Sequence, residues 1–396
     1  MDLLGTPALL FLGAVVALLR LPLPFAARRA VLLAFNVAFL ASFDPLAPAL
    51  FLATAAYAFA LARRAERGLT GWRLHLACAP LLVPLFLPKL GTFAEQAQGN
   101  AANVLGSRML LFIGASYFTL RALHFVLDAR RKGRAALPFV DYLVWNSFFP
   151  TIVAGPIERS EHFAKSYGQL GRASREDVAA GLTRIFHGLL KRAVAAPLCL
   201  AWAGDITGFR IGEVVPAGEA WLALYAICLY AYFDFAGYSD LALGAARLLG
   251  IRLAENFDQP YLRTSIAGFW QGWHISLSQW IRDYLFIPFC GRSPSKLRPH
   301  VAAVASMALC GLWHGVTPGW VLWGVAHGGA LSAHQVWTGW LRKRPRLKKR
   351  LAASTAARVA AVLLTFHFVA LSWTLISIDT RDLRPALHYV AALLGL

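Results

Sequence analysis

Long apolar segments recur along the whole chain and are separated by short polar stretches. The chain is 58% hydrophobic and 15% charged, whereas soluble proteins average about 45–50% and about 25%. A straight membrane-spanning helix needs about 20 apolar residues, and several segments are shorter. We therefore expect an all-α polytopic membrane protein with about 10–11 transmembrane or re-entrant helices. The expected segments lie near residues 5–25, 29–43, 45–62, 73–91, 108–128, 178–203, 217–236, 297–314, 318–340 and 355–378, with a short last one from 384.

The basic residues lie in clusters between apolar segments. The chain has 39 Lys and Arg against 20 Asp and Glu, a formal net charge of +19. Clusters at the ends of apolar helices are typical of cytoplasmic loops, with the lipid bilayer and its anionic headgroups as the partner. The pattern argues against a nucleic-acid partner, because the cations do not line one helix or a polar domain. The clusters are Arg63, Arg64, Arg67 and Arg73, then residues 129–134, then residues 342–350.

Neither the cysteines nor the amino terminus indicates a processed or metal-stabilised protein. The five cysteines show no paired spacing, so we expect no disulfide framework and no metal site. The first residues lack a basic n-region and a small-residue cleavage site, which favours a retained first membrane helix over a cleaved signal. We expect a single integral-membrane domain over residues 1–396.

Two regions, residues 135–177 and 232–296, depart from the apolar pattern. They are too apolar for solvated loops and too polar to face lipid. Polar or irregular backbone at membrane depth persists only where it is buried in protein or lines a wet cavity. We therefore predict a membrane domain with a hollow centre. No internal repeat is visible, which weighs against an inverted-repeat transporter.

The segment "GWHISLSQWIRDYLFIPF" has two interpretations. As a helix, it places His274, Ser278, Ile281, Arg282 and Leu285 on one broad face. That face would form a cavity floor that aims His274 inward, with Arg282 and Asp283 fixing it. The alternative is a membrane-surface helix anchored by its Trp and Arg side chains, and spacing alone favours this alternative.

Acidic residues mark two further segments. Asp234 and Asp240 flank Gly237 and Tyr238, and an ionisable group within a membrane is by default a functional hypothesis. For Asp240 we favour the other interpretation, a helix N-cap opening "LALGAARLLG". Residues 147–163 resemble a broken helix that ends in a Gly-Pro turn, with Glu158 and Arg159 at the interface.

The hexapeptide "CGLWHG" places His314 at the end of an apolar helix. Apolar walls keep an imidazole neutral, so that it can accept a proton from a hydroxyl during acyl transfer. A lone buried histidine is nevertheless more often structural, and these residues alone leave both interpretations open. We interpret His327 as a helix-packing or polar-relay residue. Isolated structural or interfacial roles are expected for His124, His187, His334, His367 and His388.

Several ordered motifs together resemble the membrane-bound O-acyltransferase (MBOAT) family. The resemblance is closest to the bacterial branch with alginate O-acetyltransferase and the D-alanyl transfer protein of teichoic acids. It spans a core of about residues 110–335. The motifs are "GASYFTLRALHFVLDARRKG", "FFPTIVAGPIERSEHF", "FDFAGYSDLALGAARLLGIRLAENFDQPYL", "FWQGWHISLSQWIRDYLFIPF" and, forty positions after His274, "GLWHG".

The resemblance implies helices around a central tunnel, with an acyl donor entering from the cytoplasm and an acceptor from the other face. The family's membrane histidine falls on His314, which would act as base or stabilise the reacting group. Its second polar position falls on His274, as the assistant. Trp273, Trp313 and the backbone of 311–315 are candidate donors to an oxyanion. The full set of tunnel candidates is Trp273, Ser278, Arg282, Asp283, Trp313, Asp240 and Asn256.

The resemblance further implies an inner-membrane enzyme that moves a short acyl group, acetyl, towards a cell-envelope polysaccharide with a separate periplasmic acyltransferase partner. The donor would be acetyl-CoA or an acyl carrier protein, with no tightly bound cofactor and no metal. D-alanyl transfer from a carrier protein is the alternative within the family, and a transporter without acyl chemistry is the alternative of another class. The chain departs from the family pattern at two places. "IPFCGRSPSK" replaces the usual glycine pair, which affects the loop after the central helix, and the chain ends soon after "HYVAALLGL", which affects the acceptor polymer.

Overall fold

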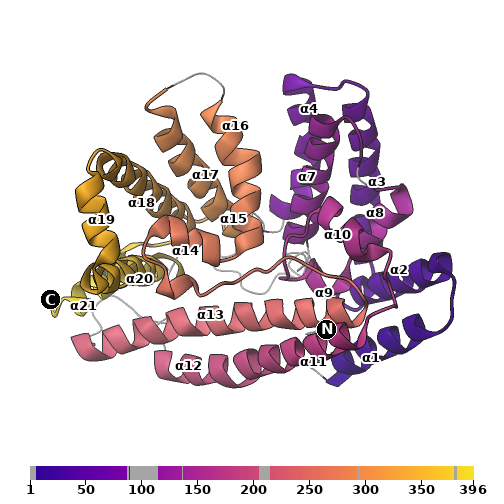
Figure 1. The fold of residues 1–396 in the computed structure, drawn as a ribbon, viewed down its shortest axis with the longest axis horizontal. Helices are drawn as coiled ribbons and strands as arrows, with labels where there is room; N and C mark the ends of the chain where they lie inside the picture. Colours follow the sequence, from indigo (N-terminus) through magenta and orange to yellow (C-terminus); the bar gives the residue numbers. More distant parts are fainter. Residues whose placement is uncertain are drawn as a thin grey trace. The chain divides into compact units, whose positions relative to one another are not determined.

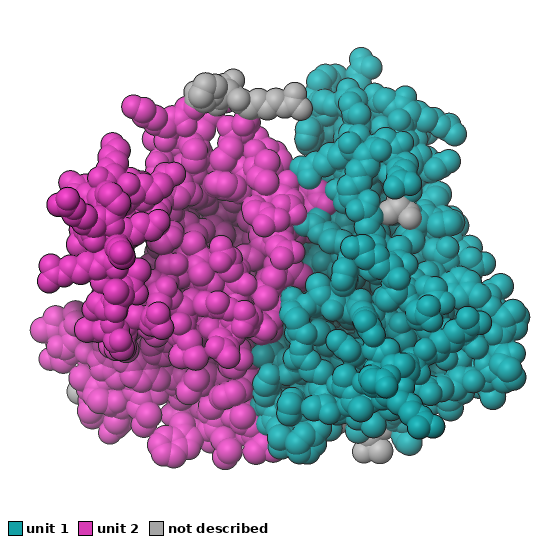
Figure 2. Space-filling model, viewed as in Figure 1, with its two compact units in different colours: residues 1–193, 235–255 teal, residues 194–234, 256–396 magenta. Residues whose placement is uncertain are grey.

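The computed structural model describes residues 6–86, 89, 115–135, 137–204, 215–291, 295–378 and 381–396 (Figure 1). The regular elements among these residues are helices, and no strand occurs within the described ranges. The predicted all-α class is therefore confirmed. The chain divides into two compact units, coloured separately in Figure 2: residues 1–193 with 235–255, and residues 194–234 with 256–396.

The first unit takes most of its helices from the amino-terminal half of the chain. Helix α11 continues through a π-helical stretch, Leu190–Ala195, into α12 (Ala196–Ala203) of the second unit. The helices of the first unit are α1 (Thr6–Arg20), α2 (Phe25–Ala41), α3 (Ala47–Glu66), α4 (Gly71–Cys78), η1 (Ala79–Leu82), α7 (Ala115–Lys132), α8 (Phe139–Asn146), α9 (Phe149–Ile152), α10 (Ser160–Tyr167) and α11 (Arg175–Leu189).

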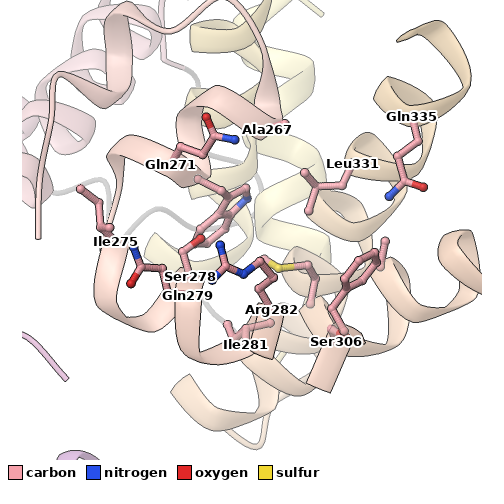
Figure 3. A pocket seen from close by; sticks show the side chains of 14 residues that line it. Ala267, Gln271, Ile275, Ser278, Gln279, Ile281, Arg282, Ser306, Leu331 and Gln335 are labelled. Carbon is pink, nitrogen blue, oxygen red and sulfur yellow. The ribbon is translucent and has the colours of Figure 1, made fainter. Parts of the chain in front are cut away.

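The second unit contains the two Trp-His motifs, Trp273-His274 and Trp313-His314. Side chains from α14, α15, η5, α17 and α18 surround a cavity of about 470 Å³ (Figure 3). Helix α13 (Ala217–Leu248) contributes to both units. The other elements are η4 (Pro260–Leu262), α14 (Ile266–Gly272), α15 (Ile275–Ile281), the π-helix η5 (Arg282–Phe286), α16 (Ile287–Cys290), α17 (Arg298–His314), α18 (Pro318–Arg342), α19 (Pro345–Ala353), α20 (Thr355–Ser377) and α21 (Arg384–Leu393).

The expected apolar segments correspond to helices almost one for one. Three helical stretches in the described part are long and apolar enough to cross a membrane: Arg175–Ala203, Ala217–Leu248 and Thr355–Ser377. Pro7–Arg20 and Gly71–Phe86 are shorter apolar helices. Of the segment expected at 108–128, residues 108–114 lie outside the described residues. The apolar pattern thus located the helices well.

Helix α13 overturns one expectation. We predicted an apolar segment ending near residue 236 and a new helix capped by Asp240, but α13 is continuous over 32 residues. At 1.5 Å per residue it is about 48 Å long. Asp240 therefore lies inside a helix, where its carboxylate cannot act as an N-cap, and the cap interpretation is wrong. The cause is that Asp240 has cationic partners, Arg184 on α11 and Lys191 just after it, which the sequence around Asp240 does not reveal.

Paired glycines bring α11 and the carboxyl-terminal half of α13 together. A Cβ atom on Gly244 would lie 2.6 Å from the carbonyl oxygen of Gly181, and one on Gly188 would lie 2.8 Å from that of Gly237. Gly181 and Gly188 are seven residues apart, as are Gly237 and Gly244. Small residues at such spacing let two helix backbones approach closely, a common packing mode in membranes.

The broken-helix prediction for residues 147–163 is confirmed, because short α9 is followed by a turn and then α10. Glu158, expected at an interface, is instead only 2% exposed. The fully buried Arg121 supports the break by donating to the carbonyl oxygens of Trp145, Asn146 and Thr151 at 3.1, 3.3 and 2.8 Å. A guanidinium thereby satisfies carbonyl groups that the short helices leave unpaired.

Two of the predicted basic clusters meet at one end of the first unit. The backbone N–H of Ala135, which follows α7, donates to the Glu66 carboxylate at the end of α3. Arg63 also pairs with Glu66 at 3.0 Å. The cluster around Arg63 and the one at residues 129–134 therefore share one end of the α3–α7 pair, as cytoplasmic loops on one side of a membrane would require.

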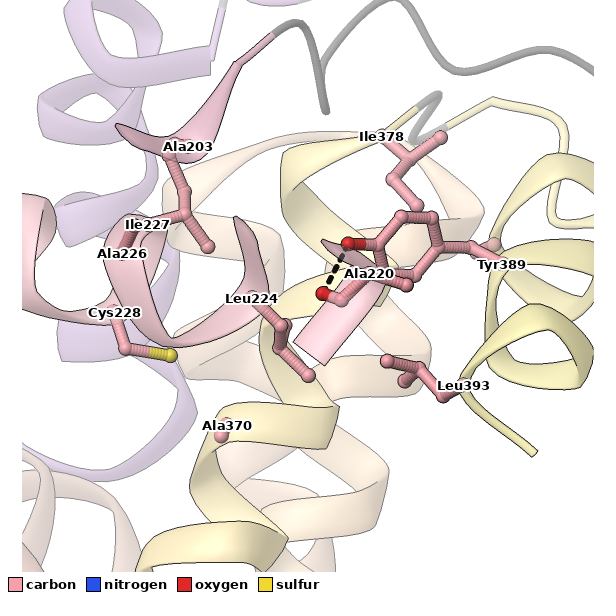
Figure 4. Packing of buried hydrophobic residues seen from close by; sticks show 11 residues of the cluster. Ala203, Ala220, Leu224, Ala226, Ile227, Cys228, Ala370, Ile378, Tyr389 and Leu393 are labelled. Carbon is pink, nitrogen blue, oxygen red and sulfur yellow. Dashed lines mark hydrogen bonds between the residues drawn. The ribbon is translucent and has the colours of Figure 1, made fainter. Parts of the chain in front are cut away.

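Apolar residues from α12, α13, α20 and α21 form the core of the second unit (Figure 4). Leu224 and Cys228 of α13 are fully buried, as is Ala370 of α20. The Tyr389 hydroxyl of α21 donates to the carbonyl oxygen of Ala220 at 2.7 Å, the bond dashed in Figure 4. This bond holds the last helix against α13 and gives a buried phenol a partner.

Candidate functional site

His274 has an unusual backbone conformation. It is the N-cap residue of α15, with φ 44° and ψ 54° in the left-handed region. Gln259 is the other non-glycine residue with positive φ among those described. Such conformations cost about 1–3 kcal/mol and concentrate at functional sites. The expectation that His274 lies on the helix face is wrong, because α15 begins at the next residue.

Asn256 fixes the first turn of α15. Its backbone carbonyl accepts from the Ile275 N–H at 3.0 Å, and its side-chain oxygen accepts from the N–H and hydroxyl of Ser276 at 3.2 and 2.9 Å. These bonds satisfy donors that a helix start leaves unpaired. Asn256, predicted as a tunnel residue, therefore orients the backbone on the carboxyl side of His274.

The residues around His314 explain the glycines of "GLWHG". His314 ends α17, and its ring stacks on Trp320 with centroids 4.8 Å apart and an interplanar angle of 13°. A Cβ on Gly311 would lie 2.0 Å from the Trp320 carbonyl oxygen, and one on Gly315 would lie 2.3 Å from the Trp320 ring. Only glycine leaves room for Trp320 at both positions.

The Trp313 ring lies close to the rings of both histidines. Its ring centroid is 4.5 Å from that of His314 and 6.4 Å from that of His274. The structure thus brings together two Trp-His motifs that lie forty residues apart in the sequence. His274 is buried, whereas His314 is partly exposed. We call His274, Trp313, His314 and Trp320 the histidine cluster.

His327 is bonded through both ring nitrogens. The Trp270 indole N–H donates to Nδ1 at 3.3 Å, so in the neutral tautomer Nε2–H donates to the Ser372 hydroxyl at 3.0 Å. Ser372 in turn donates to the carbonyl oxygen of Val369 at 2.6 Å. An imidazole with both nitrogens engaged holds α14, α18 and α20 together, in agreement with the predicted packing or relay role.

The cavity in Figure 3 adjoins this region through Ile275 and Trp270. Of the predicted tunnel residues, it is lined by Ser278 and Arg282. Arg282 Nε donates to its neighbour Asp283 at 2.8 Å, so these two predicted polar residues pair with each other. The remaining walls are Ala267, Trp270, Gln271, Ile275, Gln279, Ile281, Phe286, Ala303, Ser306, Met307, Leu331 and Gln335.

The sequence did not single out four polar residues that line this cavity: Gln271, Gln279, Gln335 and Ser306. The Ser306 hydroxyl is buried and forms no hydrogen bond with the described residues. A buried polar group usually has a partner, so this hydroxyl is available to a molecule in the cavity. A lone serine in "VAAVASMALC" was the available signal, since polar atoms in an apolar membrane helix require an explanation.

Two other predicted tunnel residues have mainly structural surroundings. Trp273 packs among aromatic rings, with centroids 5.2 Å from Phe257, 5.7 Å from Phe269 and 6.1 Å from Trp373. Asp240 belongs to the first unit, where it pairs with Arg184 at 2.5 Å and Lys191 at 2.6 Å. Asp240 of α13 thus neutralises one cation of α11 and one of the π-helical stretch Leu190–Ala195 that follows it.

All five thiols are free. No group of three or more His, Cys, Asp or Glu side chains with metal-binding geometry occurs in the part of the chain that the structure describes.

The family model described as "MBOAT, membrane-bound O-acyltransferase family" matches residues 81–378. The chain belongs to this family. Its histidine cluster, from residue 274 to residue 320, lies inside the match, as do all the residues that line the cavity. The expected membrane-protein class and MBOAT relationship are therefore confirmed.

Several curated MBOAT relatives are similar to this chain. "Probable alginate O-acetylase AlgI" of Pseudomonas aeruginosa is 32% identical over 273 residues, which cover 68% of this chain and 49% of the relative. "Peptidoglycan O-acetyltransferase" of Helicobacter pylori is 28% identical, covering 73% and 58%. "Teichoic acid D-alanyltransferase" of Bacillus subtilis is 29% identical, covering 75% of each. The chain spans about half the length of the alginate relatives that it matches.

Proposed function

We propose that this MBOAT protein is an O-acyltransferase of the bacterial inner membrane that moves an acetyl group from a cytoplasmic donor towards a cell-envelope polysaccharide. The observation that carries the proposal is the convergence of His274 and His314 around Trp313. Relatives named for O-acetyl transfer to alginate or peptidoglycan support the acyl group and acceptor class.

In this proposal, His314 acts as the general base. It accepts the proton of an acceptor hydroxyl while the hydroxyl oxygen attacks the acyl carbonyl carbon. A C–O bond forms, the carbonyl becomes an oxyanion, and its collapse breaks the C–S bond of the thioester. The proton on His314 then passes to the leaving thiolate. The stacked Trp320 fixes the imidazole plane, and His274, whose ring also lies close to Trp313, acts as the assistant.

The cavity suits a thioester donor, either acetyl-CoA or an acyl carrier protein. Its apolar walls carry the amides of Gln271, Gln279 and Gln335 and the hydroxyls of Ser278 and Ser306. A pantetheine arm has alternating amide and methylene groups, so such a mixed lining offers both hydrogen bonds and apolar contact. We propose no tightly bound cofactor. A periplasmic acyltransferase partner would complete transfer to the polymer.

D-alanyl transfer from a carrier protein towards teichoic acid or a related polymer is the second candidate. It is favoured by one observation: the match to the Bacillus subtilis D-alanyltransferase covers 75% of both chains, whereas the matches to alginate relatives cover about half of the relative. Binding of acetyl-CoA compared with that of a D-alanyl-charged carrier separates the two candidates.

The decisive variant is His314→Ala, expressed in cells that lack the wild-type gene. A general base contributes about 10²–10⁴-fold to rate, so envelope acylation should fall to background while membrane insertion stays normal. His334→Ala on α18, outside the cluster, is the matched control and should retain acylation. Wild-type acylation by His314→Ala would refute the catalytic role. Solute movement in liposomes without binding of any acyl donor would instead favour a transporter.

A further inference from the structure

A second cavity, of about 500 Å³, lies within the first unit, and none of its lining residues belongs to the histidine cluster. Its walls come from α10, from the loop before α11 with the first turn of that helix, and from the segment after α13. In contrast to the cavity of Figure 3, the lining is almost entirely polar. We call it the basic pocket; it is lined by His162, Lys165, Ser166, Gln169, Arg172, Ser174, Asp177, Gly250 and Arg252.

Backbone contacts hold the walls of the basic pocket together. The Gly171 N–H donates to the carbonyl oxygen of Leu249 at 2.8 Å, and the Arg252 N–H donates to the Ser166 hydroxyl at 3.0 Å. Gly250 has φ +83°, and a Cβ there would lie 2.3 Å from the Gln169 carbonyl oxygen. A left-handed glycine therefore permits the close approach that joins the two walls.

The buried Glu158 is not a lining residue but holds parts of the pocket wall in place. It accepts from His162 Nδ1 at 2.6 Å and from the Ala254 N–H at 2.9 Å. The carboxylate thus fixes the His162 ring at the pocket wall and ties α10 to the segment after α13. Its charge is directed at His162 and the backbone, which leaves Asp177 as the carboxylate among the lining residues.

Positive charge in the basic pocket exceeds negative charge. Asp177 is shared by two cations, with Arg252 at 3.1 Å and Arg247 at 3.5 Å. Among the residues that the structure describes, Lys165 and Arg172 form no ion pair. The lining therefore combines three permanent cations with one carboxylate that is already shared, next to the hydroxyls of Ser166 and Ser174.

We propose that the basic pocket binds a phosphate ester. Arginine presents a planar fork that matches phosphate oxygens, and lysine adds a compact charge. The side chains that line the pocket are polar or charged, which favours an ionic ligand over an acyl chain. The phosphate can come from the headgroup of an anionic phospholipid or from a soluble phosphate-bearing molecule such as coenzyme A. The coenzyme A source rests on the proposed function, whereas the lipid source does not.

The test uses the full-length purified protein and two probes. Native mass spectrometry with equal phosphatidylglycerol and phosphatidylcholine measures selective lipid retention, and titration with coenzyme A, followed by thermal unfolding, measures soluble-ligand binding. The variant is Lys165→Gln/Arg172→Gln, which removes the two unpaired cations. The matched control is Lys348→Gln/Arg350→Gln on α19, which removes two exposed cations elsewhere.

We expect the pocket variant to lose at least about tenfold in affinity for one probe, with the control unchanged. Loss of phosphatidylglycerol retention identifies a lipid headgroup, and loss of coenzyme A binding identifies the soluble source. Equal binding of both probes by the pocket variant and the wild type would overturn the proposal. His314→Ala leaves the basic pocket intact, so it should bind like the wild type even if acylation is lost. Failure of one proposal is thus distinguishable from failure of the other.

Discussion

The side-chain oxygen of Asn256 accepts two hydrogen bonds from Ser276, two residues after His274. Asn256 touches no reacting atom and acts as a positioning residue, because it sets the start of the helix that follows the strained histidine. Asn256→Ala removes both bonds, about 1 kcal/mol each. We expect kcat to fall about tenfold or more with the donor KM nearly unchanged.

Ser276→Ala is a milder change to compare with Asn256→Ala. It removes the hydroxyl donor but keeps the backbone N–H bond to Asn256, so its effect on kcat should be smaller than that of Asn256→Ala. Asn256→Asp keeps both acceptor functions and should recover part of the rate. If the apparent kcat of all three variants falls only in proportion to their loss of folded protein, the positioning role is wrong. Thermal unfolding of each purified variant provides that check.

Asp240 neutralises two cations, Arg184 on α11 and Lys191 on the π-helical stretch that follows it. Breaking a buried pair by removing one partner is strongly destabilising, but both cations here are about one-third exposed, which reduces the effect. We expect Asp240→Asn to lower the free energy of unfolding by about 1–3 kcal/mol. Adding Lys191→Gln to that variant should restore part of the loss, since it removes one unpaired charge. A double variant less stable than the sum of both single changes would contradict this account.

The apolar pattern located most helices, because burial in lipid imposes a strong compositional signal on each span. It failed at Asp240, where Ser and Asp after a glycine resemble an N-cap and the true partners lie about fifty residues earlier. The π-helix at Arg282–Phe286 was also missed, since no local pattern encodes one extra residue per turn. Only longer-range contacts distinguish these cases.

The candidate site was less accessible to sequence reasoning than the helices. The residues around His314 are compatible with both a catalytic base and a structural histidine. The role of His274 as its assistant came from the family resemblance and not from residue spacing. Ser306 was missed because one hydroxyl in an apolar helix carries no directional signal, whereas its burial against the cavity becomes evident in three dimensions. The sequence likewise does not explain the glycines of "GLWHG", because the requirement for them comes from the packing of Trp320 against both positions.

Gly244 tests the close packing of α11 and α13. A Cβ there would lie 2.6 Å from the Gly181 carbonyl oxygen, so Gly244→Ala must separate the helices and should lower the unfolding temperature. Gly218→Ala on the same helix has nothing within 4 Å of the added Cβ. Alanine improves helix propensity by about 0.8–1 kcal/mol, so this control should be neutral or stabilising. Equal unfolding temperatures for both variants would argue against the glycine contact.

His162 gives a pH dependence with a defined sign. The hydrogen bond to Glu158 raises the pKa of His162 above its usual value, against partial desolvation and the Lys165 charge. Asp177 and Arg252 line the same pocket. Because the folded-state pKa is raised, the added stability is fully present below about pH 6.5. It is lost as the pH rises through the folded-state pKa.

His162→Gln keeps a side-chain donor for Glu158 but does not titrate. The unfolding temperature of the wild type should therefore exceed that of this variant more at pH 6 than at pH 8.5. The His162 side chain is 41% exposed, so the difference should be small. A difference that grows towards high pH would contradict the assigned direction.

Ser306→Ala distinguishes the role of the Ser306 hydroxyl in binding a ligand from its effect on stability. The buried hydroxyl has no partner among the described residues, and an unsatisfied buried polar group costs about 1–3 kcal/mol. Its removal should leave the unfolding temperature unchanged or raised. If the hydroxyl bonds to the acyl donor, the donor KM should nevertheless rise several-fold, so that stability and donor affinity change in opposite directions. Ser306→Leu should be more severe, because it also fills the cavity between Trp270 and Arg282. Donor kinetics unchanged in both variants would show that the donor binds elsewhere.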